Sequence, residues 1–164
     1  MFRIRAARAE DLPATETIET LADALLIERF RARDWPPATS AAERARTPGF
    51  VLVAENAAEI AGFVQVIEAE GHAHLEQLSV LPSHTRRGCG RLLVAAALDE
   101  ARRRRHRRLT LRTYADVPWN ASFYASCGFR ESEPDTEFLR RLVAGERRLG
   151  LFAHGPRVQM TIDL

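Results

Sequence analysis

Apolar and polar residues alternate at both ends of the chain, a period that is typical of half-buried β-strands. Near the start, residues 2–6 place apolar side chains between arginines, and residues 158–164 alternate in the same way at the end. Between them, residues 50–54 and 61–67 are apolar runs separated by a polar stretch that suits a hairpin turn. Residues 74–81 predict a third strand that extends this pair. The pattern therefore predicts two terminal strands and an internal β-meander.

Helix-forming stretches alternate with these strands. The acidic residues and the proline within residues 10–13 favour a helix start, and the sequence after them predicts a helix to about residue 33. Residues 90–105 predict a second helix, which leads into a strand over residues 109–114. An arginine-rich amphipathic stretch predicts a further helix over residues 137–149.

Two segments are less regular. Residues 35–49 contain three prolines and predict an irregular connection. Residues 118–127 predict a short helix that ends at Gly128.

Strands before and after a strand–helix–strand unit indicate an α/β (α+β) fold: a mixed, mostly antiparallel central sheet with helices on both faces. Neither a repeat nor a linker divides the 164 residues, so we expect a single domain over residues 1–164.

Composition narrows the function classes. With 46% hydrophobic and 28% charged residues, the chain resembles an ordinary soluble protein, and its net charge of +2 is too small to indicate a nucleic-acid partner. All 24 basic residues are arginine, and lysine is absent. Two cysteines, Cys89 and Cys127, form neither a disulfide framework nor a zinc-ligand spacing. No secretion signal and no apolar run of about 20 residues is present, so we expect a cytoplasmic protein without a membrane or metal partner.

One stretch suggests a phosphate site. In residues 78–100, LSVLPSHTRRGCGRLLVAAALDE, a strand runs into a glycine-containing turn and then into a helix. The unpaired amides and the positive dipole of a helix N-terminus bind anions, and Gly88 and Gly90 let a phosphate approach the backbone. Arg86, Arg87 and Arg91 add charged donors. Many such turns only connect a strand to a helix and bind no ligand.

Two familiar phosphate motifs do not fit this turn. A P-loop requires a lysine, and the chain has none. A dinucleotide-binding fingerprint requires a third glycine, and Leu93 occupies its place. That turn also follows a β-meander instead of opening the fold.

The chain instead resembles the GNAT superfamily of N-acetyltransferases. That family carries a [QR]-x-x-G-x-[GA] turn shortly after a proline, and this chain reads TRRGCG over residues 85–90, after Pro82. Thr85 departs from the usual Gln or Arg. The segment VPWNASFYASCGF over residues 117–129 is similar to the family's asparagine-to-FYxxxGF segment, and residues 4–12 resemble its first strand and helix. The resemblance covers essentially the whole chain.

The resemblance implies acetyl-CoA as cosubstrate. Its pyrophosphate would bind the amides of residues 86–91, and its pantetheine arm would pair with a strand where the two parallel strands of a central βαβ unit splay. Asn120 either contacts this arm or caps the short helix. The residues implied in cofactor binding are Leu78, Ser79, Val80, Arg86, Arg87, Gly88, Cys89, Gly90, Arg91 and Asn120.

The resemblance also implies the catalytic groups. In this family the tyrosine at the position of Tyr124 often donates a proton to the departing CoA thiolate. Without that role, Tyr124 would be an ordinary core aromatic. His74 and Glu76 are candidate bases for the acceptor amine, or else solvated residues at a strand edge. Because side chains alternate along a strand, we expect both to share a face with Leu78 and Val80.

We therefore expect an N-acetyltransferase that delivers the acetyl group to a primary amine by direct attack. The alternative is a GNAT-fold module that binds CoA without turnover. The arginine-rich run at residues 101–108 invites a nucleic-acid role, but cations at a helix C-terminus also favour the helix dipole. The acceptor should contact residues 25–40, including Trp35, and also Trp119. A homodimer is an assembly that the resemblance allows.

Overall fold

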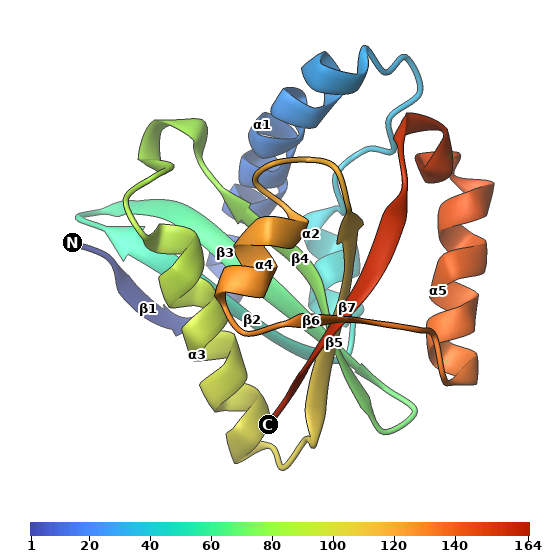
Figure 1. Ribbon diagram of the computed structural model, residues 1–164. Helices are drawn as coiled ribbons and strands as arrows, with labels where there is room; N and C mark the ends of the chain where they lie inside the picture. Colours follow the sequence, from blue (N-terminus) through green and yellow to red (C-terminus); the bar gives the residue numbers. More distant parts are fainter.

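Seven strands form one sheet in the order β1-β2-β3-β4-β5-β7-β6. The computed structural model describes all 164 residues (Figure 1). The strands are β1 (Arg3–Ala6), β2 (Gly49–Asn56), β3 (Glu59–Ala69), β4 (His72–Val80), β5 (Arg108–Tyr114), β6 (Arg130–Ser132) and β7 (Arg157–Asp163). Every neighbouring pair is antiparallel except β4 and β5, which are parallel. The predicted mixed, mostly antiparallel sheet is confirmed.

Helices cover both faces of this sheet (Figure 1). They are α1 (Leu12–Phe30), α2 (Ala41–Arg46), α3 (Cys89–Arg103), α4 (Ala121–Ser126) and α5 (Glu137–Arg148), with short 3₁₀ turns at Ala9–Asp11, Pro82–His84 and Leu151–His154. Helices α3 and α4 lie over one face, and α1 and α2 lie over the other. Helix α5 lies on the same side of the sheet as α1, and its Phe138 stacks on His72 of β4. No helix combines the length and the apolar character needed to cross a membrane.

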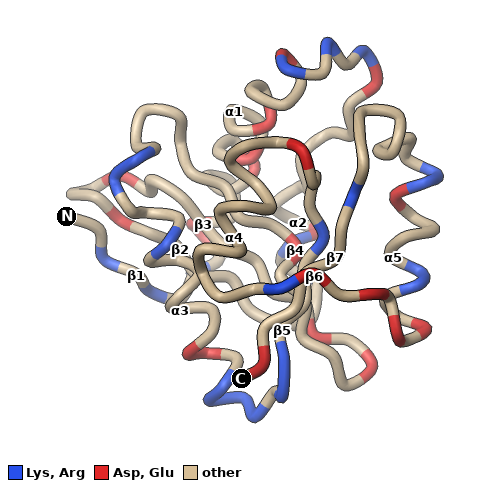
Figure 2. The backbone as a smooth tube through the Cα atoms, viewed as in Figure 1, with Lys and Arg blue, Asp and Glu red and all other residues tan.

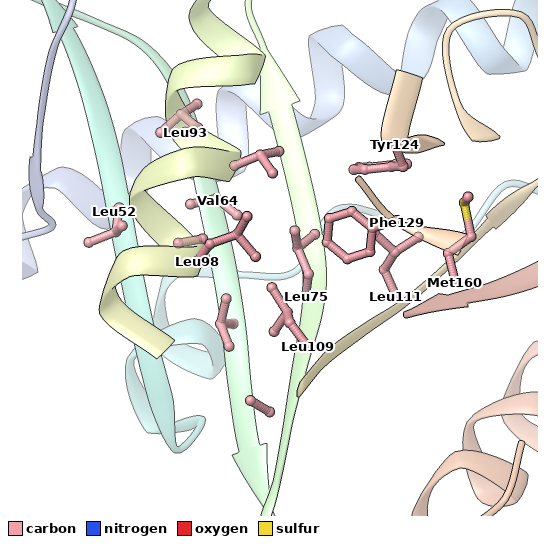
Figure 3. Packing of buried hydrophobic residues seen from close by; sticks show 14 of the residues in the cluster. Leu52, Val64, Leu75, Leu93, Leu98, Leu109, Leu111, Tyr124, Phe129 and Met160 are labelled. Carbon is pink, nitrogen blue, oxygen red and sulfur yellow. The ribbon is translucent and has the colours of Figure 1, made fainter. Parts of the chain in front are cut away.

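The larger hydrophobic core lies between the sheet and helix α3 (Figure 3). Leu52, Val64 and Leu75 point from the sheet toward Leu93 and Leu98 of the helix. A smaller cluster on the opposite face joins Ile18 of α1 to the β2 and β3 side chains Val53 and Phe63. The alternation that predicted the strands therefore places one apolar set under each helical layer.

Two elements were not predicted. Helix α2 interrupts the expected irregular connection, because the Ser40 hydroxyl caps it by accepting from the Glu43 amide, and because Arg44 is buried. The Arg44 guanidinium donates to Gln65, Thr15 and Glu19, at 2.8, 2.9 and 2.5 Å. Strand β6 is only three residues long and pairs with β7 alone. Both elements depend on long-range partners that no local pattern reveals.

Strand β4 contains a bulge at Glu76. Gln65 of β3 lies opposite Gln77, whereas the next residue, Val66, lies opposite Leu75. Glu76 is therefore an extra residue on β4 without a partner on β3. A bulge of this kind bends the strand and changes the direction of its side chains.

Candidate active site

The parallel strands β4 and β5 separate after a very short contact. They pair only where His74 lies opposite Thr110 and Leu75 lies opposite Leu111. Beyond Leu75, strand β4 pairs with β3 alone. The backbone of β4 after the bulge therefore has an unpaired edge on the β5 side, which is the splay that the resemblance implied.

The turn before α3 presents a row of unpaired backbone donors. None of the amides from Thr85 to Arg91 donates to another group of the protein. Gly88 is the N-cap of α3 and has φ of +83°, and Arg86 also has a positive φ of 63°. An ideal Cβ built on Gly88 would meet nothing within 4 Å, so the space over this turn is open. Such a cluster of free amides at a helix N-terminus is suited to an anion.

Gly90 joins this turn to the unpaired edge of β4 and to helix α4. An ideal Cβ on Gly90 would lie 3.5 Å from Cζ of Phe123 and 4.0 Å from side-chain atoms of Leu78 and Val80. The structure thus brings together three of the predicted segments: the glycine turn, the end of β4 and the FYxxxGF helix. A ligand that binds the turn and the strand edge would extend past α4.

The side chains of this turn have different surroundings. Arg86 and Arg87 are exposed. The Arg91 guanidinium instead donates to the Ser126 hydroxyl at 2.8 Å and lies over Phe123, so it ties α3 to α4. The prediction that all three arginines supply side-chain donors to a phosphate therefore does not fit Arg91, whose free backbone amide remains the relevant group.

Cys89 and Asn120 also take defined positions. Cys89 is buried, and burial raises the pKa of its thiol to about 11, so the side chain is a core residue and its amide alone faces the turn. Asn120 is the N-cap of α4, but its side chain makes no capping hydrogen bond. Its backbone amide donates to Val117 O at 3.0 Å, whereas its side-chain amide has no partner in the protein.

Tyr124 has a buried ring and a free hydroxyl. The ring packs edge-on against Phe123 and Phe129, with centroid distances of 5.2 and 5.9 Å. Figure 3 shows Tyr124 beside Phe129. No protein group hydrogen-bonds the hydroxyl, and the residue is 9% exposed. Burial, with a smaller contribution from Cys127, raises the pKa of Tyr124 above its ordinary value. The residue is therefore a protonated phenol over a wide pH range.

Glu76 carries its carboxyl at the bulge. The side chain is 48% exposed, and its Oε2 lies 3.9 Å from Nε2 of His74. Desolvation raises the pKa of Glu76 to about 7, and the charges of Glu146 and Glu19 add to the shift. The carboxyl thus meets solvent on one side and protein on the other. Its pKa is close to the value that suits a general base at neutral pH.

His74 is buried and neutral. Its Nδ1 is 2.7 Å from Oγ1 of Thr110, across the short contact between β4 and β5. Burial lowers the pKa of His74 to about 3, and the nearby Arg112 acts in the same direction. Such an imidazole accepts a proton poorly at neutral pH. Of the two predicted bases, Glu76 has a pKa near neutral pH and His74 does not.

The predicted shared face of the strand is wrong. Leu78 and Val80 pack with Leu75 against the α3 core, whereas His74 contacts Thr110 on the opposite face of the sheet. The bulge at Glu76 causes the difference, because the extra residue shifts the alternation by one position. His74 and Glu76 do lie near each other, on the face away from α3.

Sequence reasoning missed a buried ion triad beside these residues. Arg112 and Arg157 both donate to the carboxylate of Glu146, at 2.7 and 3.0 Å. Burial alone would raise the pKa of Glu146, but the hydrogen bonds from the two arginines outweigh it and leave the pKa below its usual range. The local sequence does not distinguish Glu146 from the exposed Glu137 of the same arginine-rich helix.

An aromatic cluster borders the C-terminal end of β5. Phe30, Trp35, Tyr114 and His154 have ring centroids 4.8 to 6.4 Å apart. A cavity of about 150 Å³ lies beside them, lined in part by Phe30, Tyr114 and His154. The predicted acceptor segment therefore supplies Phe30 to the cavity wall and Trp35 to the aromatic cluster beside it. Trp119 is 46% exposed and lies under the Arg29 guanidinium.

Comparisons with known proteins indicate one family and one fold. The sequence model of the Acetyltransferase (GNAT) family matches residues 14–129. A ribosomal-protein-alanine N-acetyltransferase from Brucella melitensis is 22% identical, with a TM-score of 0.69 and 99% of each chain covered. The PaiA N-acetyltransferase from Thermoplasma acidophilum, solved in complex with coenzyme A, is 16% identical, with a TM-score of 0.69 over 100% of this chain and 99% of that one. The ribosomal-protein-S18-alanine N-acetyltransferase from Escherichia coli is 20% identical, with a TM-score of 0.66 over 99% and 94%. These structures share the fold.

Proposed function

The chain belongs to the acetyltransferase (GNAT) family, and we propose that it transfers an acetyl group from acetyl-CoA to a primary amine of an acceptor by direct attack. Like its family, it is an N-acetyltransferase with acetyl-CoA as the acetyl donor. One arrangement carries the proposal: free amides before α3, an unpaired edge on β4 and the FYxxxGF helix meet around Gly90.

The cofactor site has two parts. The amides of residues 86–91 hold the pyrophosphate, with Arg86 and Arg87 free to add charge. The backbone of Leu78, Ser79 and Val80 pairs with the pantetheine arm as an additional strand would. The fit rests on chemistry: both parts are donors or acceptors that the fold leaves without partners.

Glu76 takes the proton from the acceptor amine. Acetyl-CoA supplies an activated acetyl group as a thioester, and an amine must lose a proton as it attacks. The pKa of Glu76, about 7, makes its carboxylate both present and sufficiently basic near neutral pH. His74 acts as a positioning residue, because its neutral ring lies 3.9 Å from the carboxylate and is fixed by Thr110.

Tyr124 supplies the second proton, to the departing thiolate. Its raised pKa keeps the phenol protonated, and its hydroxyl has no competing partner in the protein. The proton lost by the amine goes to Glu76, and the proton gained by the thiolate comes from Tyr124. A free amide at the unpaired edge of β4 polarises the thioester carbonyl.

A release assay tests the proposal. The protein is mixed with acetyl-CoA and with peptides bearing a free N-terminus, lysine peptides, polyamines or amino acids, and free thiol is measured. We expect acceptor-dependent release of CoA, which is lost in Glu76→Gln. Because the chain has no lysine, acetyl-lysine in the mixture comes from the acceptor. Tight acetyl-CoA binding with no release by any amine class would instead favour the binding module.

A further inference from the structure

A second cavity lies at the opposite end of α3 from the glycine turn. Its volume is about 390 Å³, larger than the cavity beside the aromatic cluster. Figure 2 shows arginines gathered in this region, at the bottom of the view, where α3 is followed by β5. The lining residues are Gly71, His72, Ala73, Arg105, His106, Arg107, Arg108 and Thr110.

The charge of this cavity is not balanced. None of its lining residues is acidic. Arg108 is paired with Asp135, and His106 with Glu68. Arg105 and Arg107 are exposed and have no ion pair or side-chain hydrogen bond. Two of the residues that line this hollow therefore keep all of their guanidinium donors free.

The backbone fixes the turn that carries these arginines. Arg105 adopts a left-handed conformation with φ of 65°, which is unfavourable for a residue other than glycine. Its amide donates to Arg102 O at 2.9 Å, and the His106 amide donates to Ala101 O at 3.1 Å, so the turn closes the end of α3. The facing wall is also ordered, since His72 stacks on Phe138 with centroids 5.5 Å apart. The free charges thus extend from a defined scaffold.

We propose that this cavity binds a compact phosphorylated anion. Guanidinium groups match the oxygens of phosphate in paired hydrogen bonds, and His72 is a further polar residue of the lining. The volume lies in the range of small-molecule sites, but the lining contains a single hydrophobic residue, Ala73, which disfavours an apolar ligand. The site is separate from the glycine turn, because the 15 residues of α3 span about 22 Å.

Titration of inorganic pyrophosphate into CoA-saturated protein tests this site. Saturation with CoA occupies the glycine turn, which would otherwise bind the same anion. We expect one saturable binding event at low salt by calorimetry. Its affinity should fall at least tenfold in the Arg105→Gln, Arg107→Gln double variant. The matched control is Arg102→Gln, at the same helix end but paired with Asp99 and outside the lining, which should change affinity less than twofold.

Two results would overturn the proposal. One is the absence of pyrophosphate binding to CoA-saturated protein whose melting temperature is normal. The other is an equal loss in the double variant and in the Arg102 control, which would indicate diffuse charge. A 12-nucleotide RNA that binds more than tenfold tighter than pyrophosphate would replace the small anion by a nucleic acid. The inference does not depend on acetyl transfer: if CoA does not bind, the same variants are titrated without it.

Discussion

The carboxylate of Glu76 lies 3.9 Å from Nε2 of His74, beside the point where β4 loses its pairing with β5. The two groups have opposite pKa shifts, since burial lowers the pKa of His74 to about 3 and desolvation raises the pKa of Glu76 to about 7. Neighbouring titratable groups with separated pKa values have different roles. Near neutral pH only Glu76 changes its protonation state, so it should control the pH dependence of the reaction.

Replacing Glu76 tests the base. The wild-type kcat/KM should rise with pH through about 7, because the carboxylate is the active form and the pKa of Glu76 is about 7. Glu76→Gln should reduce kcat by about 10²-fold or more and abolish this rise. Glu76→Asp should retain the rise at a lower rate. A Gln variant with the wild-type rate and profile would mean that the amine loses its proton to water.

Tyr124→Phe should reduce kcat by about 10²-fold or more with acetyl-CoA affinity nearly unchanged. The ring still packs against Phe129, and the lost hydroxyl made no hydrogen bond in the protein, so the melting temperature should also be retained. Equilibrium binding and single-turnover kinetics separate the two quantities. Unchanged single-turnover rates would leave Tyr124 as a core aromatic.

Gly88→Val should remove the increase in melting temperature that saturating acetyl-CoA produces. The left-handed φ of +83° makes valine unfavourable there, and the new side chain occupies the open space over the amides. Gly150→Val is the matched control, since Gly150 has φ of +73° and nothing within 4 Å of its Cβ. Both variants should lose similar intrinsic stability, and only the control should keep the acetyl-CoA effect. Retention of that effect in Gly88→Val would place the pyrophosphate elsewhere.

Glu146→Gln should destabilise the protein by about 3–5 kcal/mol, the usual effect of removing one partner from a buried ion pair. The side chains of Glu146, Arg112 and Arg157 are only 10%, 6% and 12% exposed, so both arginines would remain buried without a counter-charge. The exposed Glu137→Gln on the same helix should change the free energy of unfolding by less than about 0.5 kcal/mol. Equal losses in denaturant unfolding would show that the triad adds nothing specific.

His74 should make the fold acid-sensitive. Its pKa is about 6.5 in the unfolded chain and about 3 in the folded one, so between these values the unfolded state binds the extra proton. The free energy of unfolding should therefore fall as pH falls from 6.5 toward 3, by up to about 1.4 kcal/mol per unit from this residue. In His74→Gln that component should be absent. A wild-type minus variant difference that does not vary with pH would contradict the assigned shift.

The sequence predicted features that depend on local order and missed those that depend on distant partners. The strand, glycine turn and helix around Gly88 were predictable, because free amides follow from chain order alone. The face of the sheet on which Leu78 and Val80 lie was not predictable, since strict alternation assumes a strand without a bulge. Helix α2 required Arg44 to find its buried acceptors, and the triad around Glu146 joins residues far apart in the chain.

The brief pairing of β4 with β5 also has a mechanical meaning. The sheet has two halves, one formed by β1 to β4 and the other by β5 to β7. Only two residue pairs join the backbones of the two halves. Side-chain packing, including Phe129 between Leu75 and Leu111, provides most of the remaining connection (Figure 3). A ligand lying along the open edge of β4 would hold the two halves of the sheet together. Hydrogen exchange of the backbone amides should then slow in both halves. Cofactor binding would in this way determine how cooperatively the two halves of the sheet unfold locally.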